Sequence, residues 1–317
     1  FFSAESNDTR RCVSSQQMTQ MAKVDSSVLS QFETGHQATV HDSQLDYFAK
    51  HIATCSSDRL VKVFRVDNAT TQHVADLVGH QGPVYRVAFS NPKSGSYLAS
   101  ASFDGSIIIW ENRNGDSVTW QQVYQVFSPN GSRSAVNSVA WAPYGDSKML
   151  AGACADGSIL IAELQNGTWQ VSTIPNAHDI GAMDVTFAPQ VGMSTTRRVA
   201  TCGCDGMVKV WTYDGARGAW VQDGGSLVGH GGDWVRSCDW APAAGLCSTS
   251  TIVSAGQDGR VVVWKQAGSE WTQSVVADMG KAAFSARWNG NASIIAVTSE
   301  DQQVALYKEI GGRWMAV

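Results

Sequence analysis

Two kinds of apolar stretch alternate along the chain. A small, apolar run ends in an Asp, a tight turn follows, and an alternating apolar and polar run ends six positions after the Asp in an aromatic residue. The pairs are Asp58 and Phe64, Asp104 and Trp110, Asp205 and Trp211, Asp258 and Trp264, and Asp301 and Tyr307. Asp156 keeps the spacing but has Ala162 in place of the aromatic residue. Successive Asp residues lie 43 to 53 residues apart, so the chain contains six copies of one repeat.

Each copy predicts four β-strands. The runs before and after the Asp predict a hairpin, and in four copies Gly follows the Asp, which is a strong turn signal. A third run lies upstream and a fourth downstream, where it usually opens with a Trp: Trp120, Trp169, Trp220, Trp271 and Trp314. Six copies of four strands predict an all-β fold, a six-bladed β-propeller over residues 28–317. Residues 1–27 are polar and predict a separate N-terminal extension.

A His residue precedes several copies, as in WD-type repeats, where it belongs to a structural hydrogen-bonded chain. The expected sets are His80, Ser100, Asp104 and Trp110; His178, Thr201, Asp205 and Trp211; and His230, Ser254, Asp258 and Trp264. A catalytic His and Asp pair is needed once in a protein, whereas these residues recur blade by blade. Buried polar groups need partners, so we interpret the sets as structural. Copies three and six lack the His, and we expect their blades to be less tightly linked.

The composition of the chain mainly excludes classes of function and site. The 317 residues carry a net charge of −5, which argues against a nucleic-acid footprint, since that needs a clustered basic surface. The seven Cys residues show no metal-ligand spacing and lie mostly in apolar runs, so we expect buried thiols and neither a metal nor a cofactor. No apolar stretch is long enough to cross a membrane, and the first residues lack the order of a signal peptide. An enzyme with a central His or metal site is the weaker alternative, because no unique acidic or His cluster is present.

The strand count leaves one strand over. Arg313–Val317 reads as the fourth strand of the last copy, yet Val28–Glu33 also reads as a fourth strand, placed just before the first repeat. One interpretation is an open ring, in which Val28, Leu29 and Phe32 help to bind a partner that supplies a seventh blade in trans. The other is that residues 313–317 are too short to pair and that Val28–Glu33 closes blade six.

An ordered set of motifs resembles the small WD-repeat subunit of the coat protein complex II outer cage, the SEC13 family. The matching segments are His41–Tyr47, Ile52–Arg59, Gly79–Val84, Val136–Pro143, Asn176–His178, Asp233–Arg236, Ser250–Ile252 and Gln257–Val261. The resemblance covers about residues 35–317. It implies an open six-bladed propeller without catalytic activity, completed by a blade from a partner that continues into a helical solenoid.

The resemblance also implies the assemblies. The partner is either the large outer-coat subunit of vesicles that run from the endoplasmic reticulum to the Golgi or a scaffold protein of the nuclear pore Y-complex. The implied locations are the cytoplasmic side of the endoplasmic reticulum and its coated vesicles, and the nuclear envelope. The membrane is then contacted only through the coat, and nucleic acid is not bound directly. Another WD-repeat adaptor, such as the related nuclear pore propeller, is the alternative.

Overall fold

The computed structural model describes residues 32–67, 70–113, 119–144, 148–190, 196–242 and 250–317. These residues form six antiparallel sheets, one for each repeat, which we number blades one to six in chain order. Within each blade the first four strands pair in the order in which the chain runs. The predicted all-β fold of six four-stranded blades is therefore confirmed.

The strands follow the repeat closely. Blades one and two consist of β1 (Val40–Leu45), β2 (His51–Ser56), β3 (Leu60–Asp67), β4 (Thr70–Val78), β5 (Val84–Phe89), β6 (Tyr97–Ser102), β7 (Ser106–Asn112) and β8 (Trp120–Phe127). Blades three and four consist of β9 (Val136–Trp141), β10 (Met149–Cys154), β11 (Ile159–Gln165), β12 (Thr168–Ile174), β13 (Ala182–Phe187), β14 (Arg198–Gly203), β15 (Met207–Asp214), β16 (Ala219–Gln222) and β17 (Leu227–Val228). Blades five and six consist of β18 (Val235–Trp240), β19 (Thr251–Gly256), β20 (Arg260–Ala267), β21 (Glu270–Asp278), β22 (Ala283–Trp288), β23 (Ile294–Ser299), β24 (Val304–Ile310) and β25 (Arg313–Ala316).

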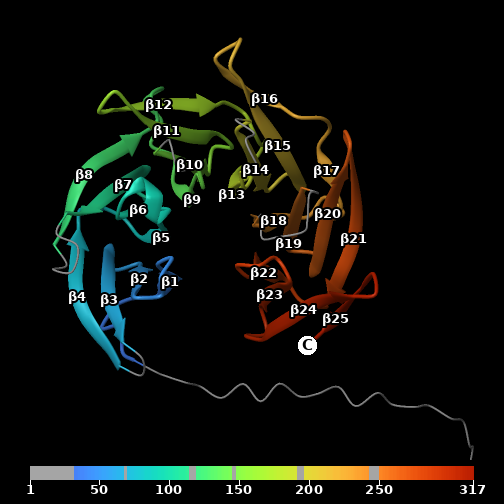
Figure 1. Cartoon of the computed structure of the whole chain (residues 1–317), viewed down its shortest axis with the longest axis horizontal. Helices are drawn as coiled ribbons and strands as arrows, with labels where there is room; N and C mark the ends of the chain where they lie inside the picture. The colour runs from blue at the N-terminus through green and yellow to red at the C-terminus, as the bar shows by residue number, and fades with distance from the viewer. Residues whose placement is uncertain (1–31, 68–69, 114–118, 145–147, 191–195, 243–249) are drawn as a thin grey trace, which may run out of the picture.

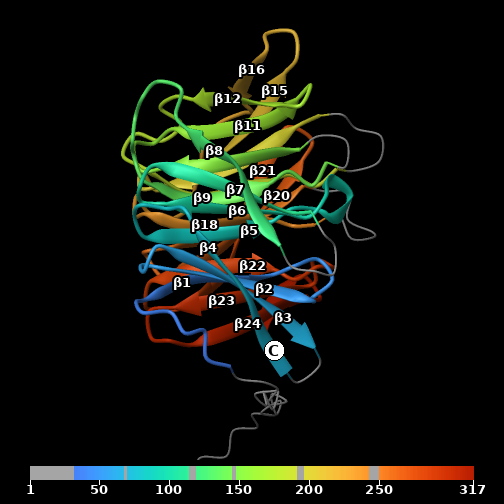
Figure 2. The same cartoon turned by 90° about the vertical axis from the view of Figure 1, so that its left-hand side faces the viewer.

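The sheets are arranged around a common centre (Figure 1). The first strand of each blade lies innermost, and we call β1, β5, β9, β13, β18 and β22 the inner strands. Figure 2 shows the sheets of the first three blades one above another, so that they pack face to face. Each inner strand contacts that of the next blade from β1 through to β22, and no comparable contact joins β22 to β1 within the part of the chain that the structure describes.

The core lies between the blades. Five clusters of buried apolar side chains join blades one and two, two and three, three and four, four and five, and five and six. β6, β10 and β19 are buried at every position because neighbouring blades cover both of their faces. Their residues are accordingly apolar or small. Among the described residues, no such cluster joins blade six to blade one.

The tight turn after each Asp uses the freedom of glycine. At Gly157 φ is +84°, a conformation that favours glycine. A Cβ at this position would also overlap the carbonyl oxygen of His178, which belongs to the segment leading into the next blade. The turn therefore serves contact between blades as well as the hairpin itself.

The missing aromatic residue in blade three is replaced by a small buried side chain. Ala162 is fully buried, and Trp141 and Trp169 pack against its cluster. The two indole rings lie 6.2 Å apart, and Trp169 also stacks on Tyr124 at 6.1 Å. The place of the missing ring therefore lies inside a packed apolar cluster.

The surplus strand is not where the sequence placed it. Of Val28–Glu33, only Phe32 and Glu33 are among the described residues, and neither is in a strand, so the predicted strand is wrong at its C-terminal end. Val28 and Leu29 lie outside the described residues, as does the predicted extension, residues 1–27. The twenty-fifth described strand is instead β17, which pairs with β15 beyond a break in the outer strand of blade four.

The C-terminal strand completes blade six. β25 pairs with β24 from Ile310 opposite Arg313 to Tyr307 opposite Ala316. The interpretation that residues 313–317 are too short to pair is therefore wrong, and blade six has four strands of its own.

Candidate partner-binding surfaces

The repeated polar residues form chains of hydrogen bonds inside the blades. In blade two, the Trp110 indole N–H donates to Ser100 Oγ at 2.9 Å, and His80 joins Ser100 at 2.8 Å to Asp104 at 2.9 Å. Burial by itself raises the pKa of the Asp104 carboxyl, but hydrogen bonds from His80, Ser106 and the backbone outweigh it and hold the pKa below its usual range. The His80 ring is thus fully occupied and 1% exposed, which is the arrangement of a structural residue.

The same chain recurs in blades four and five. His178 joins Thr201 at 2.9 Å to Asp205 at 2.9 Å, and His230 joins Ser254 at 2.8 Å to Asp258 at 3.0 Å. The indole nitrogens complete both chains, with Trp211 donating to Thr201 and Trp264 donating to Ser254.

The remaining blades carry shorter versions. In blade one, His36 joins Thr54 at 2.9 Å to Asp58 at 2.8 Å, but Phe64 takes the place of the Trp. In blade three, the Ser132 hydroxyl donates to Asp156 at 2.9 Å where a His stands elsewhere. In blade six, Asp301 accepts from Ser299 alone among side chains. These chains lie within single blades, so they stabilise the scaffold and do not gather into one reactive cleft.

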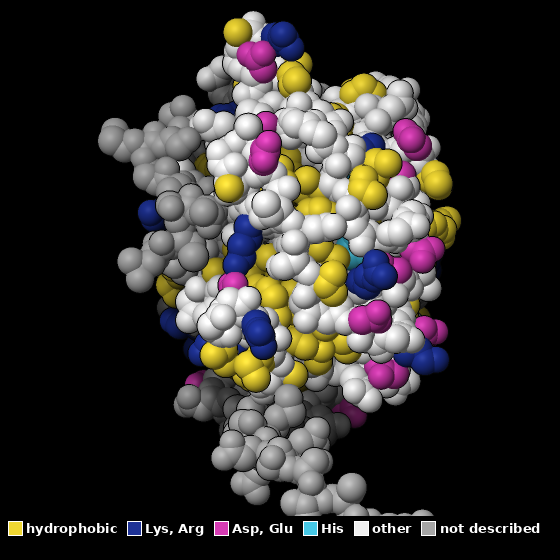
Figure 3. All heavy atoms as spheres, turned by 90° about the vertical axis from the view of Figure 1, so that its right-hand side faces the viewer, with side chains coloured by type: hydrophobic (Ala, Val, Ile, Leu, Met, Phe, Trp, Pro, Cys, Tyr) yellow, Lys and Arg dark blue, Asp and Glu magenta, His cyan; other side chains and the backbone are white. Residues whose placement is uncertain are grey.

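One face of blade six is uncovered. The side chains at Ala296, Val304 and Leu306 lie on the face away from blade five. Val304 is 68% exposed, whereas Val261 at the equivalent place in blade five is 0% exposed because blade six covers it. Ile310 is 50% exposed and Met315 45%. Figure 3 shows hydrophobic side chains gathered in the lower half of this side of the molecule, where Figure 1 places blades five and six.

The facing side of blade one is also incompletely covered. In blade two, Leu98 and Ile108 pack against blade one and are fully buried. The equivalent residues in blade one are Ile52 and Lys62, and both are only half-buried. Phe32 is the one residue of the predicted partner-binding set that the structure describes. Its ring lies 5.0 Å from that of Phe64, on this side of blade one.

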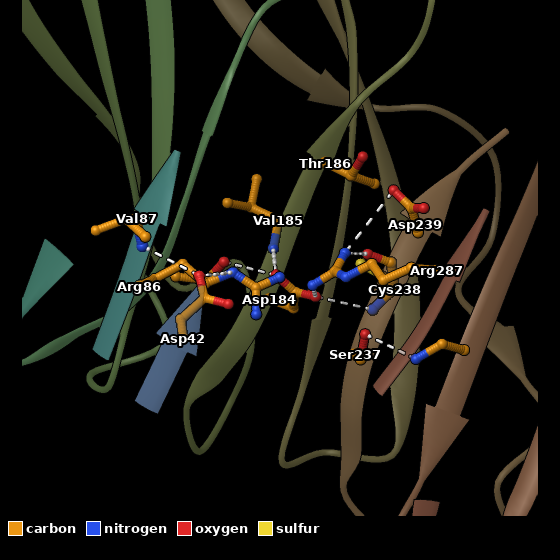
Figure 4. Close-up of polar contacts among 12 residues, drawn as sticks. Asp42, Arg86, Val87, Asp184, Val185, Thr186, Ser237, Cys238, Asp239 and Arg287 are labelled. Carbon is orange, nitrogen blue, oxygen red and sulfur yellow. Dashed lines mark hydrogen bonds and ion pairs between the residues drawn. The ribbon is translucent and has the colours of Figure 1, made fainter. Parts of the chain in front are cut away.

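A polar network crosses the centre between the blades (Figure 4). Asp184 of blade four is its hub and is only 3% exposed. Its carboxylate accepts from Arg287 of blade six at 2.6 Å and from Ser138 of blade three at 2.6 Å, and Arg86 of blade two lies 3.9 Å away. Backbone N–H groups of Val185 and Cys238 also donate to it. Groups from blades two, three, five and six thus meet at one side chain of blade four.

Two acidic side chains border the hub. Burial raises the pKa of Asp239 to about 7, and the nearby charge of Asp184 adds to this, while the Trp288 N–H and Arg86 oppose it. On the opposite side, Asp42 of blade one lies 3.5 Å from Arg86. Sequence reasoning missed this network. The signal in the sequence is a pair of polar residues at the third and fifth places of the inner strand, as in β1, β13 and β18.

The described cysteines are buried and unpaired: Cys55, Cys154, Cys202, Cys204 and Cys238. Burial raises the pKa of Cys154 to about 12, so the thiol stays protonated and unreactive at neutral pH. Across the described ranges, no group of three or more His, Cys, Asp or Glu residues could hold a metal ion. The same ranges contain no helix long and apolar enough to span a membrane.

Comparisons with known families follow the repeat. The model described as "WD domain, G-beta repeat" matches residues 27–65, 71–111, 169–212 and 222–265, which together make up just over half of the chain. The model described as "Anaphase-promoting complex subunit 4 WD40 domain" matches residues 117–187.

Curated relatives match nearly the whole chain. The "Protein SEC13 homolog" of Drosophila melanogaster is 36% identical over 308 residues, which cover 92% of this chain and 83% of that protein. The "Protein transport protein sec13" of Emericella nidulans is 34% identical over 304 residues, covering 90% of this chain and 96% of that protein. The "Protein transport protein SEC13" of Yarrowia lipolytica is 36% identical over 294 residues, covering 88% and 95%.

Proposed function

The chain belongs to the SEC13 family of WD-repeat proteins, and on that premise we propose that it is a scaffold subunit of the outer coat of vesicles that carry protein from the endoplasmic reticulum to the Golgi. WD-repeat proteins of this family are structural, and the chain is not an enzyme. In the proposal its six blades form an open ring. A partner inserts a seventh blade between blades six and one and continues into a helical solenoid, which the propeller stiffens.

The uncovered face of blade six is the observation that carries this proposal. Val304 is 68% exposed and Leu306 is only half-buried, although the residues at these two places in blade five, Val261 and Val263, are fully buried under blade six. A surface of this kind marks an interaction site. Burying the exposed part of these side chains contributes about 1 kcal/mol each. Because blade six already has its own fourth strand, the incoming element is a whole blade and not a single strand.

Blade one supports the same proposal from the other side. The half-buried Ile52 and Lys62 would be covered by an inserted blade in the way that blade one covers Leu98 and Ile108. Phe32 lies beside Phe64 at the same place, and with Val28 and Leu29 it belongs to the segment that we propose to border the partner. An inserted blade would also form apolar clusters with blades six and one, where none of the five existing clusters lies.

We propose two partners for this gap, the large outer-coat subunit and a scaffold protein of the nuclear pore Y-complex. The corresponding locations are the cytoplasmic side of the endoplasmic reticulum with its coated vesicles, and the nuclear envelope. The same apolar faces would serve both partners, since each would present a blade. Mass spectrometry of partners captured separately from membrane-free and nuclear-envelope fractions distinguishes the two assemblies.

Substitution in the gap tests the proposal. Tagged full chain should capture a protein that carries a blade-forming segment before a helical solenoid, and Val304→Asp should lower that capture at least tenfold. Val228→Asp is the matched control, because Val228 is 58% exposed on the outer strand of blade four, away from the gap. Equal capture by both variants, or recovery of the wild-type chain as a lone monomer, would refute the proposal.

A further inference from the structure

At several junctions, backbone N–H groups on the free edge of an inner strand donate to side chains of the preceding blade. In an antiparallel edge strand, every second N–H points away from the sheet. In β5 these are the N–H groups of Val87 and Phe89. Val87 donates to Asp42 Oδ2 at 3.2 Å and Phe89 donates to Gln44 Oε1 at 2.6 Å, and both acceptors belong to β1 of the preceding blade.

The same arrangement recurs between blades four and five. The N–H groups of Cys238 and Trp240 donate to Asp184 at 3.2 Å and to Thr186 at 3.4 Å. The two acceptors are again two residues apart, at the third and fifth places of the inner strand.

Blades five and six repeat it once more. The N–H groups of Ala286 and Trp288 donate to Ser237 at 3.4 Å and to Asp239 at 2.8 Å. The two remaining junctions have Ala88 or Ala140 at the fifth place, so no side-chain acceptor is available there. The pair of acceptors therefore occurs at three of the five junctions. These include the first junction, between blades one and two, and the last, between blades five and six.

Blade one presents the same two donors with nothing before them. Asp46 N–H donates to His51 O at 2.8 Å, and this fixes the alternation of β1 so that the N–H groups of Ser43 and Leu45 point away from β2. Both residues are exposed. Within the part of the chain that the structure describes, no side chain accepts from either.

Blade six cannot supply the missing pair of acceptors, because only the Ser285 hydroxyl, at the third place, can accept. Its inner strand carries Ser285 and Arg287 at the third and fifth places. Arg has donors only. The guanidinium is turned back toward blades four and five, where it donates to Asp184 at 2.6 Å and to Cys238 O at 3.0 Å (Figure 4).

We infer that the inserted blade carries on its inner strand two hydrogen-bond-accepting side chains two residues apart, drawn from Asp, Asn, Gln, Ser and Thr, which accept from the backbone N–H groups of Ser43 and Leu45. The inference rests on the proposed function, since it names what the partner's blade must contain. The spacing follows from the strand period, which puts residues i and i+2 on one face. The acceptors select for partners because an N–H left without an acceptor in a closed interface weakens binding by about tenfold or more.

Proline substitution separates the backbone donor from the side chain. The probe is the captured partner's blade-forming segment with its solenoid, bound to full-length chain. Leu45→Pro removes the N–H at an edge position where no ladder bond is lost, and Leu45→Ala keeps it. We expect Leu45→Pro and Ser43→Pro each to raise Kd about tenfold, and the Ala variants at both positions to stay within about threefold of wild type.

Amide hydrogen exchange of the wild-type chain tests the same point without a substitution. The Ser43 and Leu45 amides should exchange freely in the unbound chain and at least tenfold more slowly in the complex. Replacing both acceptors of the partner by Ala should abolish that protection. If the two amides were already protected in the unbound full-length chain, a segment of the chain itself would occupy the place, and the inference would be wrong.

The outcomes distinguish the two proposals. Failure of the wild-type chain to bind any blade-bearing partner refutes the proposed function. Binding with equal Kd for the Pro and Ala variants, and without protection of the two amides, refutes only the acceptor pair.

Discussion

Replacing Asp184 by Ala should destabilise the whole propeller, because this one carboxylate connects side chains or backbone from blades three, four, five and six. It accepts from Ser138, from Arg287 and from the N–H groups of Val185 and Cys238. The carboxylate is 3% exposed, so water does not replace these contacts in the folded state.

The size of the effect can be worked from these contacts. Val185 and Cys238 are buried, and each N–H left without an acceptor costs about 1–3 kcal/mol. Arg287 is 30% exposed, so it can turn to water, and the lost ion pair costs less than the 3–5 kcal/mol typical of a fully buried one. The expected loss is about 3–5 kcal/mol in the free energy of unfolding. For a chain of this size, that is a fall in Tm of roughly 5–8 °C.

Chemical denaturation at pH 7 is the assay, with Asp42→Ala as the matched control. Asp42 occupies the same third place in the inner strand of blade one, but it accepts from one N–H and lies 3.5 Å from Arg86, so its loss should cost about 1 kcal/mol. Asp184→Asn keeps an acceptor oxygen and should fall between the two. A loss for Asp184→Ala no greater than that for Asp42→Ala would refute the hub role.

Three further predictions concern single blades. The pKa of Asp239 is raised to about 7 in the folded state, so this group binds its proton more tightly there than in the unfolded chain, and the stability it contributes is lost as pH rises from about 4 to about 7. Since 20% of the side chain is exposed, the loss in the free energy of unfolding should be roughly 2 kcal/mol. Urea titrations at several pH values should show that this free energy depends less on pH in Asp239→Asn than in the wild type. An unchanged pH dependence would contradict the assignment. Ser100→Ala leaves both His80 and Trp110 without their shared partner and should cost about 2–4 kcal/mol by denaturation, whereas a cost below 1 kcal/mol would show that the chain is dispensable. Ala162→Trp, which restores the aromatic residue of the repeat, should destabilise by about 1–3 kcal/mol because Ala162 is fully buried in an apolar cluster, and a rise in Tm would show that a cavity is present.

The blades could be predicted from the sequence because their contacts are local. The His of each set lies 20 to 28 residues before the hydroxyl residue and the Asp, within one repeat, so the repeat itself brings them together. The turn after each Asp is equally local. Of the predicted strand Val28–Glu33, only the C-terminal end was wrong among the described residues, and Val28 and Leu29 lie outside them.

The central network could not be predicted because its partners are distant in the chain. Arg287 and Asp184 are 103 residues apart, and their contact depends on the angle at which six sheets close around the centre. The break before β17 is local by contrast. Asp223, directly after β16, accepts from Arg198 of β14 at 2.7 Å, and Gly224 follows with φ of +77°, a conformation outside the range of a β-strand.

At three of the five junctions, side-chain acceptors reach from one blade to the next, which gives the series of blades a direction. That direction bears on self-association. Repeated units with complementary ends can stack head to tail, and such contacts between identical copies grow into filaments when they do not close. Blade one offers backbone donors, and blade six has Arg287, a donor, at the place where an acceptor would be needed. Two copies meeting end to end would therefore place Arg287, a donor, opposite a backbone N–H donor of blade one and leave that N–H without an acceptor, which is costly. The side chain that anchors the centre thus also keeps one copy from serving as the next blade of another.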